Sequence, residues 1–223
     1  MCTYQGGKQR LGKKIYQVIS QIEHDVYPQS KTGAKTDYFE PMVGMAGVLK
    51  HFAKDADRKI YACDINPDIV ALWKALQKGW KPPLKCTEAK YDRLKASKKS
   101  TPEKAFIGIV ASWGGNYFHA YRLKYEPAGR SYMQEGHDQL TKLTPVIKNV
   151  RFINARSYDK HSPKNMIVYC DPPYTSNKLS NKTFFGNFNH ADFWNKMRRW
   201  SKHNIVVVSE WSAPSDFTKI SNL

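Results

Sequence analysis

Apolar runs of strand length alternate with helix-like segments over the first third of the chain. The run Thr36–Pro41 predicts a short strand, and Val48–Lys54, behind a glycine-bearing turn, has helical spacing. Arg58–Pro67 predicts a second strand, and Asp68–Gln77 predicts a helix with its apolar residues on one side. This order of elements is typical of a mostly parallel, doubly wound α/β sheet.

The alternation stops over residues 77–145 and then resumes. The interrupting stretch is rich in lysine, glycine and aromatic residues and has no strand-like run. The later predicted elements are strands over 150–159, 165–174 and 204–211 and an amphipathic helix over 190–203. We therefore expect a catalytic domain formed by residues 1–76 and 146–223, interrupted by a mostly helical insertion over 77–145.

Net charge is the strongest feature of the composition. The 223 residues include 36 Lys and Arg against 19 Asp and Glu, which gives a formal net charge of +17 at pH 7. Such an excess favours a polyanionic partner through counterion release, and nucleic acid is the leading candidate. A basic surface that only keeps the protein in solution is the alternative.

The sequence has no feature of an exported or membrane protein. Its first residues lack the apolar core of a secretory signal, and no later stretch has the ~20 apolar residues that a membrane span needs. The four cysteines have no metal-binding spacing, and His161, His190 and His203 suggest none either. We expect a cytoplasmic protein, or a nuclear one if the chain is viral, with no metal and no membrane partner.

The most specific motif is Asp171-Pro172-Pro173-Tyr174, which follows the apolar run Met166–Cys170. Ligands of open parallel sheets bind beyond the carboxyl ends of the strands, where this motif would lie. Because prolines lack N–H donors, the Asp171 carboxylate and the rigid Pro172 carbonyl form an acceptor patch that suits a nucleobase amine. The carboxylate would stabilise the positive charge of an attacking amine, and Tyr174 would stack on a base taken out of its duplex. A plain strand-ending turn is the alternative.

A second candidate site lies in the first half of the chain. The turn Gly44–Gly47, between a predicted strand and a predicted helix, allows a ligand to approach the backbone closely. Asp64, at the end of the next predicted strand, is placed to accept hydrogen bonds from ribose hydroxyls. Together they indicate a nucleoside-bearing cofactor, although the glycines alone would fit an ordinary turn. The turn does not match GxGxxG, which argues against a dinucleotide.

Five sequence blocks together resemble a known enzyme family. In chain order they are YQGGKQRLGKKI, DYFEPMVGMAGVL, YACDINPDIV, ASWGGNYFHAYR and IVYCDPPY. They look like the blocks of Dam-type (D12 class) DNA adenine-N6 methyltransferases, in the order of the alpha group. The resemblance implies the class I methyltransferase fold, S-adenosylmethionine as cofactor, double-stranded DNA as partner, and residues 77–145 as the target-recognition domain.

The resemblance also implies roles for individual residues. Asp171–Tyr174 would hold the target adenine. The cofactor-binding residues that it implies are Tyr4, Lys8, Glu40, Pro41, Met42, Gly44, Asp64 and Asp171. The chain departs from the family at Met42, where Phe is usual, and at Ala46, where a second glycine is usual. The final β-hairpin of the family is expected to be short or missing.

Other residues have two readings each. Asp159 could accept from the cofactor adenine or be a plain turn acid. In the block SWGGNYFHAYR, interleaved aromatic and basic residues could stack on bases and grip phosphates, or could form the core of a small helical insertion. The candidate DNA-binding residues are Trp113, Asn116, Tyr117, Arg122 and Arg130. Ser209, Glu210 and Trp211, which end the last predicted strand, are candidates to line the pocket, with no assigned role.

The combined expectation is a site-specific DNA methyltransferase. It would transfer a methyl group from S-adenosylmethionine directly to the N6 amine of a flipped-out adenine. Two alternatives are an N-methyltransferase that acts on a protein glutamine amide and a DNA-binding relative that has lost methyl transfer. The sequence favours neither a monomer nor a homodimer.

Overall fold

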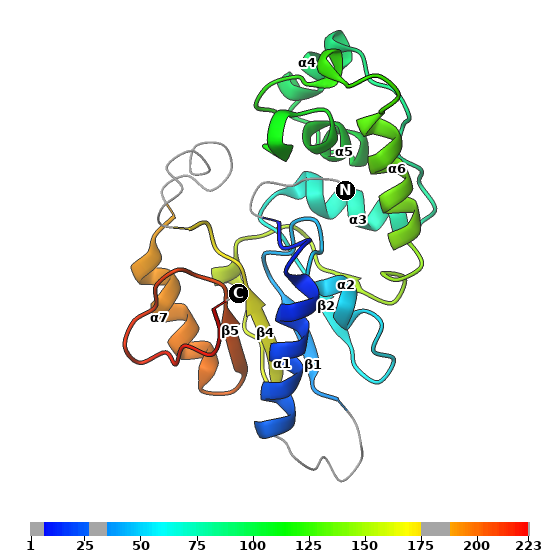
Figure 1. The fold of residues 1–223 in the computed structure, drawn as a ribbon. Helices are drawn as coiled ribbons and strands as arrows, with labels where there is room; N and C mark the ends of the chain where they lie inside the picture. The colour runs from blue at the N-terminus through cyan, green and yellow to red at the C-terminus, as the bar shows by residue number, and fades with distance from the viewer. Residues whose placement is uncertain (1–6, 27–34, 175–187, 223) are drawn as a thin grey trace.

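The computed structural model describes residues 7–26, 35–174 and 188–222, which form an α/β fold around a parallel sheet (Figure 1). The sheet has five strands in the order β3-β2-β1-β4-β5, and every neighbouring pair is parallel. The strands are β1 (Asp37–Glu40), β2 (Ile60–Ala62), β3 (Arg151–Phe152), β4 (Met166–Cys170) and β5 (Ile205–Val208). The predicted parallel α/β sheet is therefore confirmed.

The strand order reverses direction at β1. From β1 the chain moves outward to β2 and β3, and it then returns to the other side of β1 as β4. Ligands of open α/β sheets bind at such a switch point, beyond the carboxyl ends of the two central strands. In this sheet those ends are Glu40 and Cys170, which places the Gly44 turn and Asp171 at the same edge.

Helices cover one face of the sheet from three segments. Tyr38 of β1 and Ile167 of β4 point into this face and belong to its buried core. The helices that contribute to the same core are α1 (Gly12–Val26), α2 (Leu49–Phe52) and α3 (Pro67–Gln77). Tyr38 stacks on Phe52 of α2 with ring centroids 3.9 Å apart, which ties the short helix to the central strand.

The opposite face packs against helix α7 (His190–Ser201). Successive strand residues point to opposite faces, so Phe39 and Val168, next to Tyr38 and Ile167, enter this second core. Helices on both faces make the sheet doubly wound, as the alternating sequence pattern predicts.

Two elements differ from the sequence-based expectation. Helix α1 is not among the predicted elements because its segment is mostly polar, although Ile15 and Ile19, one turn apart, are both buried against the sheet. The strand predicted over 150–159 is only Arg151–Phe152 long. After Ile153, whose N–H still donates to the Ala62 carbonyl of β2, the chain leaves the sheet edge for a 3-10 turn, Tyr158–Lys160.

The segment between α3 and β3 is helical. It contains α4 (Glu88–Ala96), α5 (Pro102–Val110) and α6 (Tyr132–Leu143), and Figure 1 shows them gathered beyond α3 at one end of the molecule. Each helix begins at a hydroxyl cap: Thr87, Thr101 and Ser131 accept from the backbone N–H three residues on. Helix α5 is buried from Ala105 to Val110 and shares the core of the sheet's α1–α3 face. The helical region is thus packed continuously onto α3.

After β5 the described residues, up to Asn222, form no further strand. Phe217 packs its ring on Trp194 of α7 at 4.8 Å, and Asp216 accepts two hydrogen bonds from Arg198. This segment therefore lies against α7. Within the described ranges, no helix combines the length and the apolar character needed to cross a bilayer.

Candidate active site

Asp171 lies at the carboxyl end of β4, directly after the buried Cys170. Its carboxylate is largely buried, with the side chain 16% exposed. Lys8 Nζ lies 2.6 Å from both carboxylate oxygens and 4.7 Å from the centroid of the Tyr174 ring. Burial raises the pKa of Asp171 to about 6, and the charge of Lys8 and a hydrogen bond with Tyr174 limit that rise. The acid is thus mostly ionised at neutral pH and is paired with Lys8, which also lies over the Tyr174 ring.

The other members of the tetrapeptide differ in their exposure to solvent. Pro172 is buried, and Pro173 and Tyr174 are partly exposed. Burial, followed by the charge of Asp171, raises the pKa of Tyr174, so its hydroxyl stays protonated. The structure therefore brings the acceptors and the ring of the predicted adenine site to one sheet edge.

The N-terminal segment that carries Lys8 is clamped onto the glycine turn. Gln9 Nε2 donates to the Met45 carbonyl at 2.6 Å. A Cβ on Gly47 would lie 2.8 Å from the backbone carbon of Lys8, and one on Gly12 would lie 2.0 Å from the Gly47 carbonyl oxygen. Both glycines are needed for this close approach, which directs Lys8 toward Asp171. No local pattern in the sequence indicates this contact, because its members meet only in three dimensions.

The glycine turn is connected to Asp64 by hydrogen bonds. Gly44 has φ +45° and donates its N–H to Asp64 Oδ2 at 2.9 Å, while Asn66 N donates to Oδ1 at 2.9 Å. Trp73 Nε1 donates to the Gly44 carbonyl at 2.9 Å. Asp64 is 5% exposed, and burial raises its pKa to about 6. Asp64 therefore braces the turn, and further acceptor sites on its carboxylate are left for a ligand.

Ala46 takes a backbone conformation that suits glycine. Its φ is +55°, in the left-handed region that side chains with a Cβ seldom adopt. Its N–H donates to the Val43 carbonyl at 2.8 Å, which closes the turn. The position where the family usually has a second glycine thus keeps a glycine-like backbone.

Glu40 ends β1 beneath the same edge of the sheet. It is 2% exposed and accepts a 2.7 Å hydrogen bond from the Tyr38 hydroxyl. Burial raises its pKa, and the charge of Asp171 raises it further, whereas that of Lys8 lowers it. Glu40, Asp64 and Asp171 thus form a group of buried acids around the switch point.

The remaining predicted cofactor residues are placed differently. Pro41 is buried and Met42 is half-buried against the α7 face. Asp159 lies in the turn before β4, where Lys160 is 3.1 Å from its carboxylate and Lys196 of α7 donates to its carbonyl. Tyr4 lies outside the described residues.

The candidate DNA-binding residues do not share one environment. Trp113 is 47% exposed and lies 5.7 Å from the ring of Tyr125, which is 58% exposed. Tyr117 is instead in the core, where its hydroxyl donates to Asp68 at 2.6 Å. Asn116 is in the turn beside Trp113, and its N–H donates to the Trp113 carbonyl.

The two candidate arginines make internal contacts. Arg122 Nε donates to the Val110 carbonyl at 2.8 Å, and its Cζ lies 3.7 Å from the centroid of the Tyr132 ring. Arg130 is exposed but pairs with Glu135 through two hydrogen bonds. Of the two aromatic candidates, Trp113 is the one that presents its ring to solvent.

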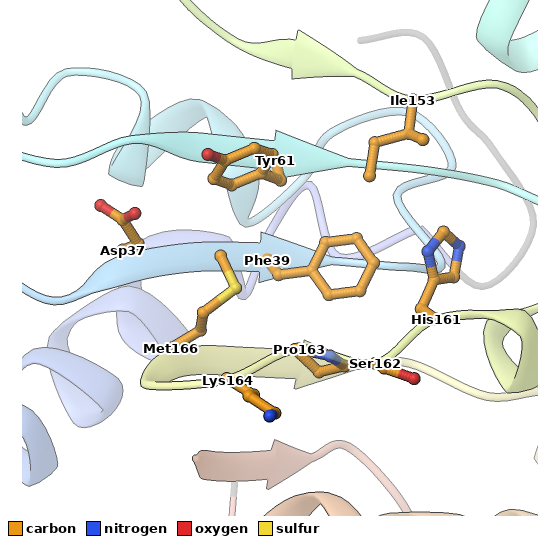
Figure 2. A pocket seen from close by; sticks show the side chains of 9 residues that line it. All are labelled: Asp37, Phe39, Tyr61, Ile153, His161, Ser162, Pro163, Lys164 and Met166. Atoms are coloured by element: carbon orange, nitrogen blue, oxygen red, sulfur yellow. The ribbon is translucent and has the colours of Figure 1, made fainter. Parts of the chain in front are cut away.

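A separate hollow of about 300 Å³ lies on the α7 face of the sheet (Figure 2). Figure 2 shows Phe39, Tyr61 and Met166 on its floor, with His161 at the edge near the end of β1. Burial lowers the pKa of His161 to about 4, so its ring is neutral. The lining of this hollow includes none of the predicted cofactor or adenine residues, so it is distinct from the site at the switch point.

The five-stranded parallel sheet is consistent with a Rossmann-like methyltransferase fold. A family model described as D12 class N6 adenine-specific DNA methyltransferase matches residues 4–134. Because the match covers more than half of the chain, the protein belongs to this family. The matched residues end before Asp171, so the tetrapeptide is evidence independent of the match. No curated protein matches the chain.

Proposed function

We propose that the protein is a site-specific DNA methyltransferase that transfers a methyl group from S-adenosylmethionine to the N6 amine of a flipped-out adenine. The observation that supports this most is the Asp171 carboxylate at the switch point, where Lys8 Nζ contacts both of its oxygens and lies over the Tyr174 ring. Membership of the D12 family supports DNA adenine as the acceptor.

The electrostatics of the site suit a cationic cofactor. Burial raises the pKa values of Glu40, Asp64 and Asp171, so the site disfavours further negative charge and gains from a nearby positive one. S-adenosylmethionine carries a sulfonium and an ammonium group, and it supplies an electrophilic methyl group. We assign its binding to the glycine turn, with Gly44 and Glu40 near the methionine part and Asp64 near the ribose.

Asp171 would act on the acceptor amine. The amine is a weak nucleophile because its lone pair is delocalised into the ring of the base. The Asp171 carboxylate and the Pro172 carbonyl would accept hydrogen bonds from its two N–H groups. The carboxylate would stabilise the positive charge that develops on the nitrogen until the methylated nitrogen releases one proton to solvent. Tyr174 would stack on the base and hold its plane.

Residues 77–145 would form the target-recognition domain. This region contains α4, α5 and α6 and the exposed Trp113–Tyr125 ring pair. An exposed ring pair in a strongly basic chain suits stacking on bases beside a phosphate backbone.

Sequencing that reads modified bases tests this function directly. DNA from cells that express the protein should carry N6-methyladenine at a defined sequence, and Asp171→Asn should abolish the signal. Asp216→Asn is a matched control, because Asp216 is an exposed acid that pairs with Arg198 away from the site. Unmodified adenine with a folded, cofactor-binding wild-type protein would contradict the proposal, as would full activity of Asp171→Asn.

A further inference from the structure

Glu210 follows β5 at the same sheet edge as Asp171. Strands β4 and β5 are paired in parallel with Cys170 opposite Val208, and Ser209 N donates to the Cys170 carbonyl at 3.0 Å. The chain after β5 therefore leaves the sheet beside the tetrapeptide. The centroid of the Trp211 ring lies 6.2 Å from that of the Tyr174 ring, so the segment after β5 contacts the tetrapeptide after β4.

The Glu210 carboxylate has an unused buried oxygen. Its Oε1 accepts from the backbone N–H of Trp211 at 2.9 Å. Its Oε2 is buried and has no hydrogen-bond partner among the described residues. A buried carboxylate oxygen without a donor is costly, so this atom is ready to accept one.

The charges around Glu210 belong to the proposed active site. Burial raises the pKa of Glu210, while the hydrogen bond from the Trp211 N–H and the electrostatic effects of His190 and Lys8 lower it. Glu210 in turn raises the pKa values of Asp171 and Tyr174. Lys8 therefore lies within electrostatic reach of three carboxylates, those of Glu40, Asp171 and Glu210, and it is hydrogen-bonded to Asp171.

The contact between Lys8 and Asp171 is incompatible with the proposed role of Asp171 in binding the acceptor amine. Lys8 Nζ occupies both oxygens of the Asp171 carboxylate at 2.6 Å. An incoming amine needs acceptor sites on that carboxylate, and the positive charge that develops on the amine would be repelled by an ammonium group beside it. Because Lys8 is only 11% exposed, it needs another acceptor near by when it moves.

We propose that Glu210 is that acceptor: Lys8 moves from Asp171 to Glu210 when the amine of the target base arrives. Glu210 is then a positioning residue for methyl transfer, and the inference rests on the proposed function. The exchange makes and breaks no covalent bond. Lys8 stays paired throughout, the unused oxygen of Glu210 gains its donor, and Asp171 is free to accept the amine.

A double-mutant cycle on single-turnover methyl transfer tests the exchange. Measured at saturating S-adenosylmethionine and DNA, Glu210→Gln should lower the rate about tenfold or more, because the amide keeps an acceptor oxygen but lacks the negative charge that stabilises a largely buried ammonium group. In a Lys8→Met background the same change should alter the rate less than about twofold, since no cation remains to be moved. Glu210→Asp, which keeps the charge, should recover part of the rate.

The controls separate this inference from the proposed function. Asp216→Asn removes an acid from the same segment after β5 and should leave the rate unchanged. A wild-type protein that methylates no adenine would overturn the proposed function itself. Given an active wild type, equal effects of Glu210→Gln in both backgrounds, or no effect in either, would overturn the role of Glu210. Thermal unfolding and cofactor affinity of each variant show that it is folded and loaded.

Discussion

The hydroxyl of Tyr117 donates a 2.6 Å hydrogen bond to Oδ2 of the buried Asp68. Asp68 lies in the first turn of α3, where Asn66 Oδ1 accepts from its N–H, and Asn66 N donates to Asp64. Lys104 of α5 lies 3.5 Å from the same Oδ2. A continuous series of hydrogen bonds thus connects Asp64, through Asn66 and Asp68, to Tyr117 in the helical region.

Tyr117→Phe should destabilise the protein. It removes the donor from a buried carboxylate and leaves the ring in place, so the free energy of unfolding should fall by about 1–3 kcal/mol. Urea unfolding measures the change. Tyr125→Phe, which alters an exposed tyrosine of the same region, serves as the control. Equal stabilities for the two variants would show that the Tyr117–Asp68 bond contributes nothing.

Gly12→Ala should also destabilise the protein, against the usual preference of helices for alanine. In a helix without such a contact, replacing glycine by alanine raises the free energy of unfolding by about 0.5–1 kcal/mol. Here the new Cβ would lie 2.0 Å from the Gly47 carbonyl oxygen, so the N-terminal segment must shift, at a cost of about 1–3 kcal/mol. Lys13→Ala, at the next and exposed position, is the control. A Gly12→Ala variant more stable than wild type would contradict the close approach.

The raised pKa of Asp64 predicts that Asp64→Asn becomes more stable relative to wild type as pH rises. Burial raises this pKa from 3.8 to about 6, so between these values the folded protein holds a proton that the unfolded chain has lost. The contribution of Asp64 to the free energy of unfolding therefore decreases as pH rises through this window. The stability of Asp64→Asn relative to wild type should accordingly increase from pH 4 to 7 by on the order of 3 kcal/mol.

Denaturant unfolding at several pH values measures this difference. The lowered pKa of His161 acts in the opposite direction over the same range but is common to both proteins, so it cancels in the comparison. Asp216→Asn is the control, because a hydrogen bond from Arg198 lowers the pKa of Asp216, and its contribution changes only below about pH 4. If the stability of Asp64→Asn relative to wild type did not vary with pH, burial would not raise the pKa of the Asp64 carboxyl.

Trp113→Ala should weaken DNA binding about tenfold or more without a loss of stability. Stacking of a base on an aromatic side chain contributes about 1–3 kcal/mol, and the exposed ring of Trp113 contributes little to the core. Fluorescence anisotropy with labelled DNA measures the affinity. Leu84→Ala removes an equally exposed apolar side chain from the same region and should bind DNA like wild type. Equal affinities for both variants would exclude Trp113 from the interface.

Local patterns were sufficient to predict the sheet, although the strand expected over 150–159 covers only Arg151–Phe152. The apolar runs around Phe39 and Val168 are continuous because both faces of these strands are buried, and the polar or turn-forming residues that follow mark the carboxyl ends. Asp171 and the Gly44 turn were therefore expected at one edge, since parallel strands bring such ends together. The lack of any strand-like run also predicted that the region before β3 is mostly helical.

The pairing of residues across that edge was decided by the tertiary structure alone. Lys8 and Asp171 are 163 residues apart in the sequence, and only the close approach of Gly12 and Gly47 brings them to 2.6 Å. Likewise, the sequence grouped Trp113 and Tyr117 as aromatic candidates, and packing buried one and exposed the other. Periodicity reports which residues a strand or helix buries, whereas long-range contacts depend on how whole elements pack. The sequence by itself thus determined the fold class and the chemistry at its edge, and the packing of distant segments decided which charges meet there.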